Sequence, residues 1–232
     1  MSALVIYPED SGKDAEDVLR ALVKLLTRAL APDHRHDKLK VNVANGEPRS
    51  AMRAHRWASP KEEGLRRALV RDLATRLRSG ELIVFHHDGD EAWRGKPGSA
   101  KHDKAVEGLL RDVRRALNTG EPDTAPVPGF LRLVPHYSVE AWLYLNHAEV
   151  QRLAPERAAR WLAAERRPGH GLDHLHKPKD DEAGKGLSDK HNRALAQSLR
   201  VEDLQESPSA RAIVEAWRGC TPLMTALSAA SP

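Results

Sequence analysis

The chain has 232 residues, a formal net charge of +4, one cysteine, 30% charged residues and only 4% aromatic residues. One cysteine excludes both a disulfide and a four-thiolate metal site within the chain, which favours a reducing compartment. The excess of Lys and Arg permits a polyanionic partner without demanding one.

The N-terminal apolar run is too short and too soon followed by acidic residues for a signal peptide. No stretch approaches the roughly 18 apolar residues that a membrane helix needs. We therefore expect a cytoplasmic protein with no membrane-embedded part.

The first 147 residues alternate strand-like and helix-like segments. Short apolar runs suit buried parallel strands, and leucines repeating every three or four residues predict helices. In chain order we expect a strand at 4–7, a helix at 18–29, a strand at 39–44, a helix at 65–77, a strand at 82–85, a helix at 106–117, a strand at 130–134 and a helix at 139–146. Ser138 is the expected N-cap of the last helix, and the polar segment 47–60 is expected to be irregular.

Repeated strand–helix units with right-handed crossovers predict an α/β fold with a four-stranded parallel sheet and helices on both faces. Beyond residue 147 the pattern becomes helical, with expected helices at 157–166, 188–199 and 208–218 and a polar loop at 167–186. We expect two parts: an α/β metal-binding domain over 1–147 and a helical C-terminal extension over 148–232 that packs on it.

Acidic residues follow three of the predicted strands. Glu9 follows the first strand, Asp88 and Asp90 follow the third, and Glu140 opens the helix after the fourth. Because the carboxyl ends of parallel strands share one edge of a sheet, these carboxylates are predicted to converge. Crowded carboxylates repel one another, and a hard divalent cation relieves the repulsion. The predicted cofactor is Mg²⁺ or Mn²⁺, with Gly89 letting the chain curl between the two aspartates.

Each of these residues also has an ordinary structural explanation. Asp-Gly is a common turn signal. Glu9 and Glu140 would both be stable near a helix N-terminus. The prediction of a metal site depends on their joint placement.

A glutamate after the first strand and an Asp-x-Asp after the third resemble the TOPRIM domain of primases, type II topoisomerases and overcoming-lysogenization-defect nucleases. The closer likeness is to the small TOPRIM-like bacterial proteins called domain of unknown function 4276. It extends to the segments 134–143, with Glu-Ala-Trp-Leu at 140–143, and 177–180, with Lys-Pro-Lys-Asp. The chain departs from the family where Glu-Gly is usual, so either Glu9 or Asp10 matches the first acid, and we prefer Glu9. His87 stands where an apolar residue is commoner.

The resemblance implies metal-dependent phosphodiester hydrolysis of nucleic acid and an ATPase partner in anti-phage defence. We expect DNA ahead of RNA as the nucleic acid, although the sequence itself does not decide between them. The four acids would then be catalytic and metal-binding residues, with Glu9 sharing the ion or acting as the base. Cations that follow the Asp-x-Asp or lie in the second motif are candidates to meet phosphate oxygens, although each has a solvated surface as its simpler explanation: Arg94, Lys101, Lys104, Lys177 and Lys179. A homo-oligomer is possible.

Other functions stay open. The chain lacks the further domains of a topoisomerase or a primase, and an aspartyl phosphatase or a sugar-nucleotide transferase fits poorly. A non-catalytic metal- or nucleotide-binding subunit of an ATPase complex is the alternative to the nuclease. One of His86 and His87 should point toward the acids by strand alternation. His170, His174 and His176 with Asp173 form a weaker candidate for zinc, because the neighbouring glycines disfavour a helix there.

Overall fold

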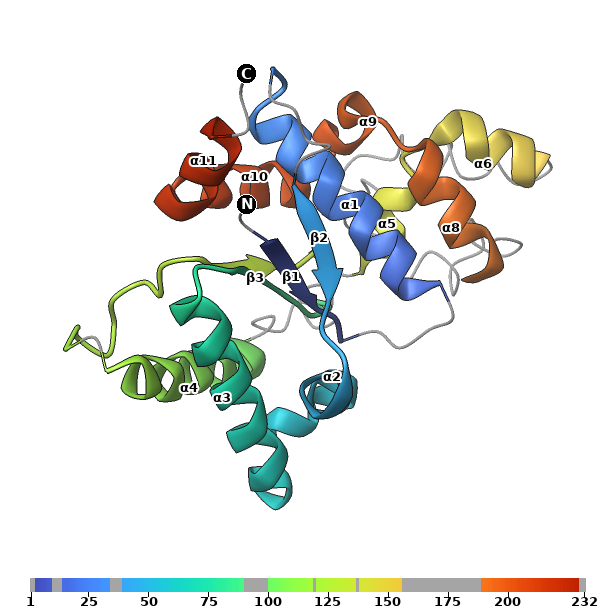
Figure 1. The fold of residues 1–232 in the computed structure, drawn as a ribbon. Helices are drawn as coiled ribbons and strands as arrows, with labels where there is room; N and C mark the ends of the chain where they lie inside the picture. The colour runs from blue at the N-terminus through green and yellow to red at the C-terminus, as the bar shows by residue number, and fades with distance from the viewer. Residues whose placement is uncertain are drawn as a thin grey trace.

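The computed structural model describes residues 3–9, 14–33, 39–89, 100–118, 120–136, 138–155 and 189–229. Its sheet has four strands in the order β2-β1-β3-β4, and every neighbouring pair is parallel (Figure 1). The strands are β1 (Ala3–Tyr7), β2 (Lys40–Val43), β3 (Leu82–His86) and β4 (Phe130–Leu133). The predicted four-stranded parallel sheet is confirmed.

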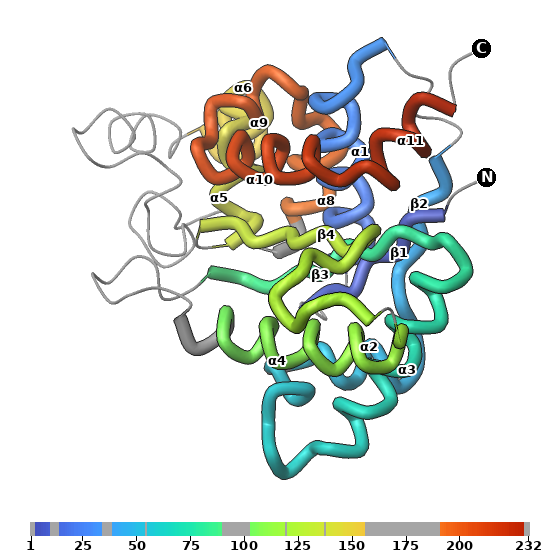
Figure 2. The backbone as a smooth tube through the Cα atoms, turned by 90° about the vertical axis from the view of Figure 1, so that its left-hand side faces the viewer, coloured from blue at the N-terminus to red at the C-terminus, as the bar shows by residue number. Residues whose placement is uncertain are grey.

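Helices cover both faces of the sheet (Figures 1 and 2). One face packs against α2 (Gly46–Met52), α3 (Glu63–Arg78) and α4 (Ala100–Leu117), with the short 3₁₀ helices η2 (Arg53–Ala58) and η3 (Pro60–Glu62) beside them. On the other side lie α1 (Ala15–Leu30), α5 (Val139–Leu143), α6 (His147–Leu153), α8 (Asp189–Ser198), α9 (Val201–Gln205), α10 (Pro208–Arg218) and α11 (Thr221–Ser228). The α/β class with helices on both faces is therefore confirmed. None of the helices in the described ranges is long and apolar enough to span a membrane.

Side chains of the central strands alternate between two cores because successive residues of a strand point to opposite faces. In β3, Leu82 and Val84 belong to the core beneath α1, α5, α8 and α10. Ile83 and Phe85 belong to the core over α3 and α4. This alternation continues past the end of the strand and decides where the residues of the candidate site point.

The segment 47–60 corrects the sequence prediction. It was expected to be irregular, but it forms α2 and η2 and buries Ala51, Met52 and Trp57. Its Ala, Arg and Met residues are compatible with a helix, but the segment has no regular apolar repeat from which a helix could be predicted. Similarly, α5 ends at Leu143 before the predicted 146, and α6, α9 and α11 were not predicted.

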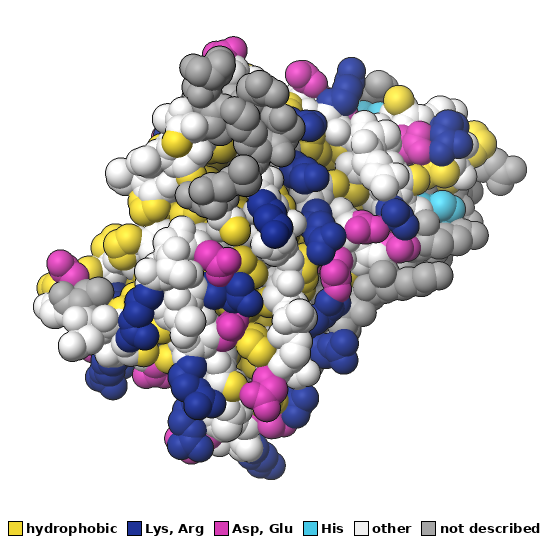
Figure 3. All heavy atoms as spheres, viewed as in Figure 1, with side chains coloured by type: hydrophobic (Ala, Val, Ile, Leu, Met, Phe, Trp, Pro, Cys, Tyr) yellow, Lys and Arg dark blue, Asp and Glu magenta, His cyan; other side chains and the backbone are white. Residues whose placement is uncertain are grey.

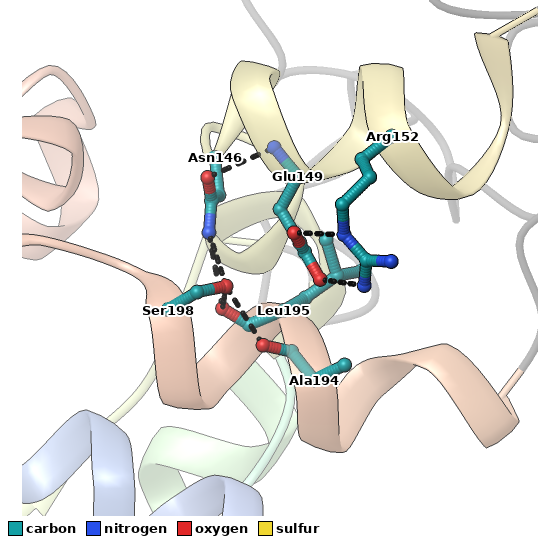
Figure 4. A network of polar contacts seen from close by, with 6 residues as sticks. All are labelled: Asn146, Glu149, Arg152, Ala194, Leu195 and Ser198. Atoms are coloured by element: carbon teal, nitrogen blue, oxygen red, sulfur yellow. Dashed lines mark hydrogen bonds and ion pairs between the residues drawn. The ribbon is translucent and has the colours of Figure 1, made fainter.

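The helices of residues 189–229 share a core with the sheet. Leu195, Ile213 and Trp217 are buried together with Leu131 of β4. A polar network joins α6 to α8 (Figure 4): Asn146 Nδ2 donates to Ser198 Oγ at 2.8 Å, and Asn146 Oδ1 accepts from the Glu149 amide at 3.3 Å. The extension therefore packs on the sheet, while the predicted domain boundary at residue 147 stays a prediction.

A buried hydroxyl joins β1 to α3. Tyr7 is fully buried, and its hydroxyl donates to the Asp72 carboxylate, which also accepts from Arg76 Nε at 3.0 Å. Burial, together with the hydrogen bond to Asp72, raises the pKa of Tyr7 well above its ordinary value of 10.0. The phenol therefore stays protonated in the folded chain after it has ionised in the unfolded one.

We expect Tyr7→Phe to lower the free energy of unfolding at pH 7 by about 1–2 kcal/mol, because Asp72 loses a buried donor. The wild-type advantage should shrink above pH 10, where only the unfolded tyrosine releases its proton and unfolding is favoured. Urea titrations of both proteins between pH 7 and 11 measure this difference. Equal pH dependences would show that Tyr7 is not held protonated.

Candidate functional site

Three of the four predicted acids lie at the carboxyl edge of the sheet. Glu9 follows β1, Asp88 follows β3, and Glu140 lies in α5 after β4. The Asp88 amide donates to Glu9 Oε2 at 2.9 Å, so the ends of the two central strands are in contact. The fourth acid, Asp90, and the alternative first acid, Asp10, lie outside the described residues.

Asp88 is a carboxyl at this edge whose pKa is raised. Its burial raises the pKa, and the negative charges of Glu140 and Glu9 raise it further, while His86 opposes the shift. The side chain keeps 27% of its surface exposed, but Oδ1 is buried and has no hydrogen-bond partner. A cation placed there would remove the repulsion that crowding creates.

Glu9 has both carboxylate oxygens engaged. Oε1 lies 2.7 Å from His55 Nε2, and Oε2 accepts the Asp88 amide. Burial alone would raise the pKa of Glu9, but the hydrogen bond and charge of His55 and the Asp88 amide together lower it. His55 has a positive φ of 52°, a conformation that costs free energy in a non-glycine residue. Sequence reasoning missed His55 because it lies in the segment that was expected to be irregular.

Strand alternation separates His86 and His87. Both are buried, but His87 faces Phe85 and His55, whereas His86 points to the face covered by α1, α5 and α8. His87 Nδ1 lies 3.2 Å from the Asp88 carbonyl oxygen, and Arg132 donates to His87 Nε2 at 3.3 Å. Nδ1 must therefore carry the proton.

His87 is neutral at physiological pH. Burial lowers its pKa to about 4, and the charge of Arg132 lowers it too. The neutral ring accepts from Arg132 through Nε2 and donates to the Asp88 carbonyl through Nδ1. It therefore links Arg132 to the backbone at the end of β3. Arg132 also pairs with Asp103 of α4 at 2.5 Å. The sequence contained a signal for Arg132, because a charged residue between Leu131 and Leu133 is unusual in a buried strand. No role was predicted for it.

On the face of the sheet covered by α1, α5 and α8, several buried polar atoms near this edge have no hydrogen-bond partner. His86 Nε2 lies 3.6 Å from Asp88 Oδ1, which is too long for a hydrogen bond, and neither His86 ring nitrogen has a hydrogen-bond partner. Ser138 Oγ and Asn192 Oδ1 are also buried and unpartnered, and Asn192 Nδ2 lies 3.5 Å from Glu140 Oε1. Ser138 does cap α5 in sequence position, but its hydroxyl makes no capping bond.

The predicted phosphate-binding cations are only partly described. Lys101 and Lys104 lie near the start of α4, and Lys104 is exposed. Arg94, Lys177 and Lys179 lie outside the described residues, as does the histidine cluster at 170–176. On the face shown in Figure 3, basic and acidic side chains alternate over α1 and α3. Some of the basic side chains are paired: Arg66 of α3 lies 2.7 Å from Asp112 of α4.

The described residues do not contain an assembled metal site. Among them, no three His, Cys, Asp or Glu side chains lie close enough together to hold an ion. Comparison with known proteins finds no matching family model, no matching curated protein and no matching solved structure. The TOPRIM resemblance and the predicted Mg²⁺ or Mn²⁺ therefore stay predictions.

Gly89 is required by a close backbone contact, while the predicted curl toward Asp90 stays a prediction because Asp90 lies outside the described residues. Its φ is not in the left-handed region, but a Cβ at this position would overlap the backbone carbonyl oxygens of Pro135 and His136. The loop after β3 therefore passes directly against the loop after β4. This close approach sets where Asp88 stands relative to α5.

We expect Gly89→Ala to lower the free energy of unfolding by about 1–3 kcal/mol, because two backbone carbonyls cannot move aside as a flexible side chain would. Gly64→Ala, near the start of α3, is the matched control, since nothing lies within 4 Å of its added Cβ. Urea denaturation should show the control unchanged or slightly stabilised. A loss of equal size in both variants would contradict the close approach.

Proposed function

We propose that this chain is a metal-dependent nuclease that hydrolyses phosphodiester bonds in nucleic acid, with DNA preferred to RNA. One observation carries the proposal: at the carboxyl edge the charges of Glu9 and Glu140, from two other segments, both act on Asp88, and the buried Asp88 Oδ1 lacks a hydrogen-bond partner. Carboxylate clusters of this kind suit hard divalent cations.

The donors present fit Mg²⁺ or Mn²⁺ in charge and chemistry. Asp88 would hold the ion through Oδ1, with Glu140 nearby and Asp90, outside the described residues, as a further predicted ligand. A bound divalent ion would neutralise charge on a phosphate ester during its hydrolysis. Relief of the repulsion among the acids would favour the ionised form of Asp88.

Glu9 takes a more restricted role than the sequence suggests. Because His55 and the Asp88 amide occupy its two oxygens, Glu9 fixes the Asp88 backbone and orients His55. His87 and Arg132 support the same backbone from the other face. These contacts would hold Asp88 in place when a phosphate binds, which is how positioning lowers a barrier.

The family resemblance supports the wider context of the proposal. It suggests a cytoplasmic protein of an anti-phage defence system that acts with an ATPase partner. Lys104, exposed near the start of α4, is the described cation that would contact a nucleic-acid backbone. Arg94, Lys101, Lys177 and Lys179 would extend that contact.

A non-catalytic role is the second candidate, and one observation favours it. Glu9, the predicted base, has no unengaged oxygen in this arrangement. The chain would then bind an ion or a nucleotide as the regulatory subunit of an ATPase complex. Binding of Mn²⁺ without cleavage, even with the ATPase of a neighbouring gene added, would favour this role.

We expect purified protein to cleave plasmid or single-stranded DNA in Mg²⁺ or Mn²⁺, and Asp88→Asn to lower the rate by at least about a hundredfold. The substitution removes the charge and keeps the side-chain size. Gel assays under single-turnover conditions with EDTA-treated controls measure the rate.

Asp123→Asn is the matched control because Asp123 is 52% exposed and pairs only with surface arginines among the described residues. It should cleave like wild type. Cleavage that continues unchanged in Asp88→Asn would exclude the proposed site, and activity that survives EDTA would exclude the metal.

A further inference from the structure

The strongest unexplained feature is the histidine at the end of β3. His86 is 1% exposed, and both of its ring nitrogens lack hydrogen-bond partners. Buried imidazoles are almost always hydrogen-bonded, since an unsatisfied polar group costs about 1–3 kcal/mol. Its neighbours in β3 are all apolar, so an apolar residue would have fitted the core there.

The ring is aimed at the acids. His86 Nε2 faces Asp88 Oδ1 at 3.6 Å, and that oxygen is also buried and unpartnered. Two ligands that each lie about 2.1 Å from one ion, at octahedral to tetrahedral angles, are about 3.0–3.4 Å apart. The observed separation is close to this range and too long for a direct hydrogen bond. The separation also lies within ion-pair range, so an ion between the two atoms would need to draw them only a few tenths of an ångström closer.

Glu140 adds charge on the same side of the sheet. Its negative charge raises the pKa of Asp88, although His86, Asp88 and Glu140 are not close enough together in the described residues to form a three-ligand site. Asn192, with its own unpartnered Oδ1, faces Glu140 from α8. His87 is excluded from this group because strand alternation turns it to the other face, where Arg132 occupies its Nε2.

We propose that His86 is a nitrogen ligand, with Asp88, to the ion at this edge, and that the site prefers Mn²⁺ or Co²⁺ to Mg²⁺. Imidazole suits borderline transition metals, whereas Mg²⁺ prefers oxygen. The inference rests on the proposed function in placing an ion here, but it does not depend on nucleic-acid cleavage.

Spectroscopy of bound Mn²⁺ tests the ligand directly. Electron spin-echo envelope modulation of the Mn²⁺-loaded full chain should show ¹⁴N coupling, and labelling with [¹⁵N]histidine should replace it. His86→Asn should lose the coupling. The matched control is His147→Asn, at a histidine that opens α6 and has no role in the proposed site, and it should keep the coupling.

Calorimetry on the same proteins tests metal preference. Wild type should bind Co²⁺ and Mn²⁺ about tenfold or more tightly than Mg²⁺, and His86→Asn should lose most of that preference. Tight binding of Mn²⁺ without ¹⁴N coupling in wild type would overturn the inference, even if the protein cleaves DNA. Failure to bind any of the three ions would overturn it as well. Nitrogen coupling without cleavage would support it while the nuclease proposal fails.

Discussion

The hydrogen bond from the Asp88 amide to Glu9 Oε2 is the contact on which this edge of the sheet depends. β1 and β3 are the two central strands, and their parallel register pairs Tyr7 with Phe85. The residues that follow therefore leave the sheet at the same level. Without a donor for Glu9, the two loops would carry repelling carboxylates and would separate. The parallel topology brings the two loops to the same edge of the sheet, and this hydrogen bond fixes their positions relative to each other.

Strand alternation then divides the edge into two chemically different sides. On the α3–α4 side, His55, His87 and Arg132 each have a polar contact, and the neutral His87 ring joins Arg132 to the Asp88 backbone. On the α1–α5–α8 side, His86 and Asp88 face each other with atoms that lack partners. The contacts of the α3–α4 side fix the Asp88 backbone, although Arg132 Nε and Trp57 Nε1 lack hydrogen-bond partners there. A ligand is therefore to be sought beside the side chains of His86 and Asp88.

The sequence predicted the strands and the placement of Glu9, Asp88 and Glu140 at one edge of the sheet, because both follow from apolar runs and parallel topology. Their convergence around one ion stays a prediction. It also predicted α10 at its observed bounds of 208–218. It could not predict His55, whose place depends on burial of the neighbouring Trp57 in a segment without a regular apolar repeat. Gly89 was expected to allow a curl, but the approach of the Pro135–His136 backbone is a tertiary constraint with no local signal. From the sequence, either His86 or His87 could face the acids. Strand alternation decides between them only when the last residue of the strand is known exactly.

The buried polar atoms without hydrogen-bond partners at this edge contrast with the apolar packing in the rest of the fold. Elsewhere β3 is apolar on both faces, and the two cores that it joins contain mainly Leu, Val, Ile and aromatic side chains. A domain of this size is stable by only about 5–15 kcal/mol, so unpaired buried groups costing about 1–3 kcal/mol each are a large part of the total. A ligand that binds the folded chain alone returns free energy in proportion to the logarithm of its concentration over its Kd. Polar groups that destabilise the empty edge would thus stabilise the occupied one, which is the behaviour of a binding site and not of a core.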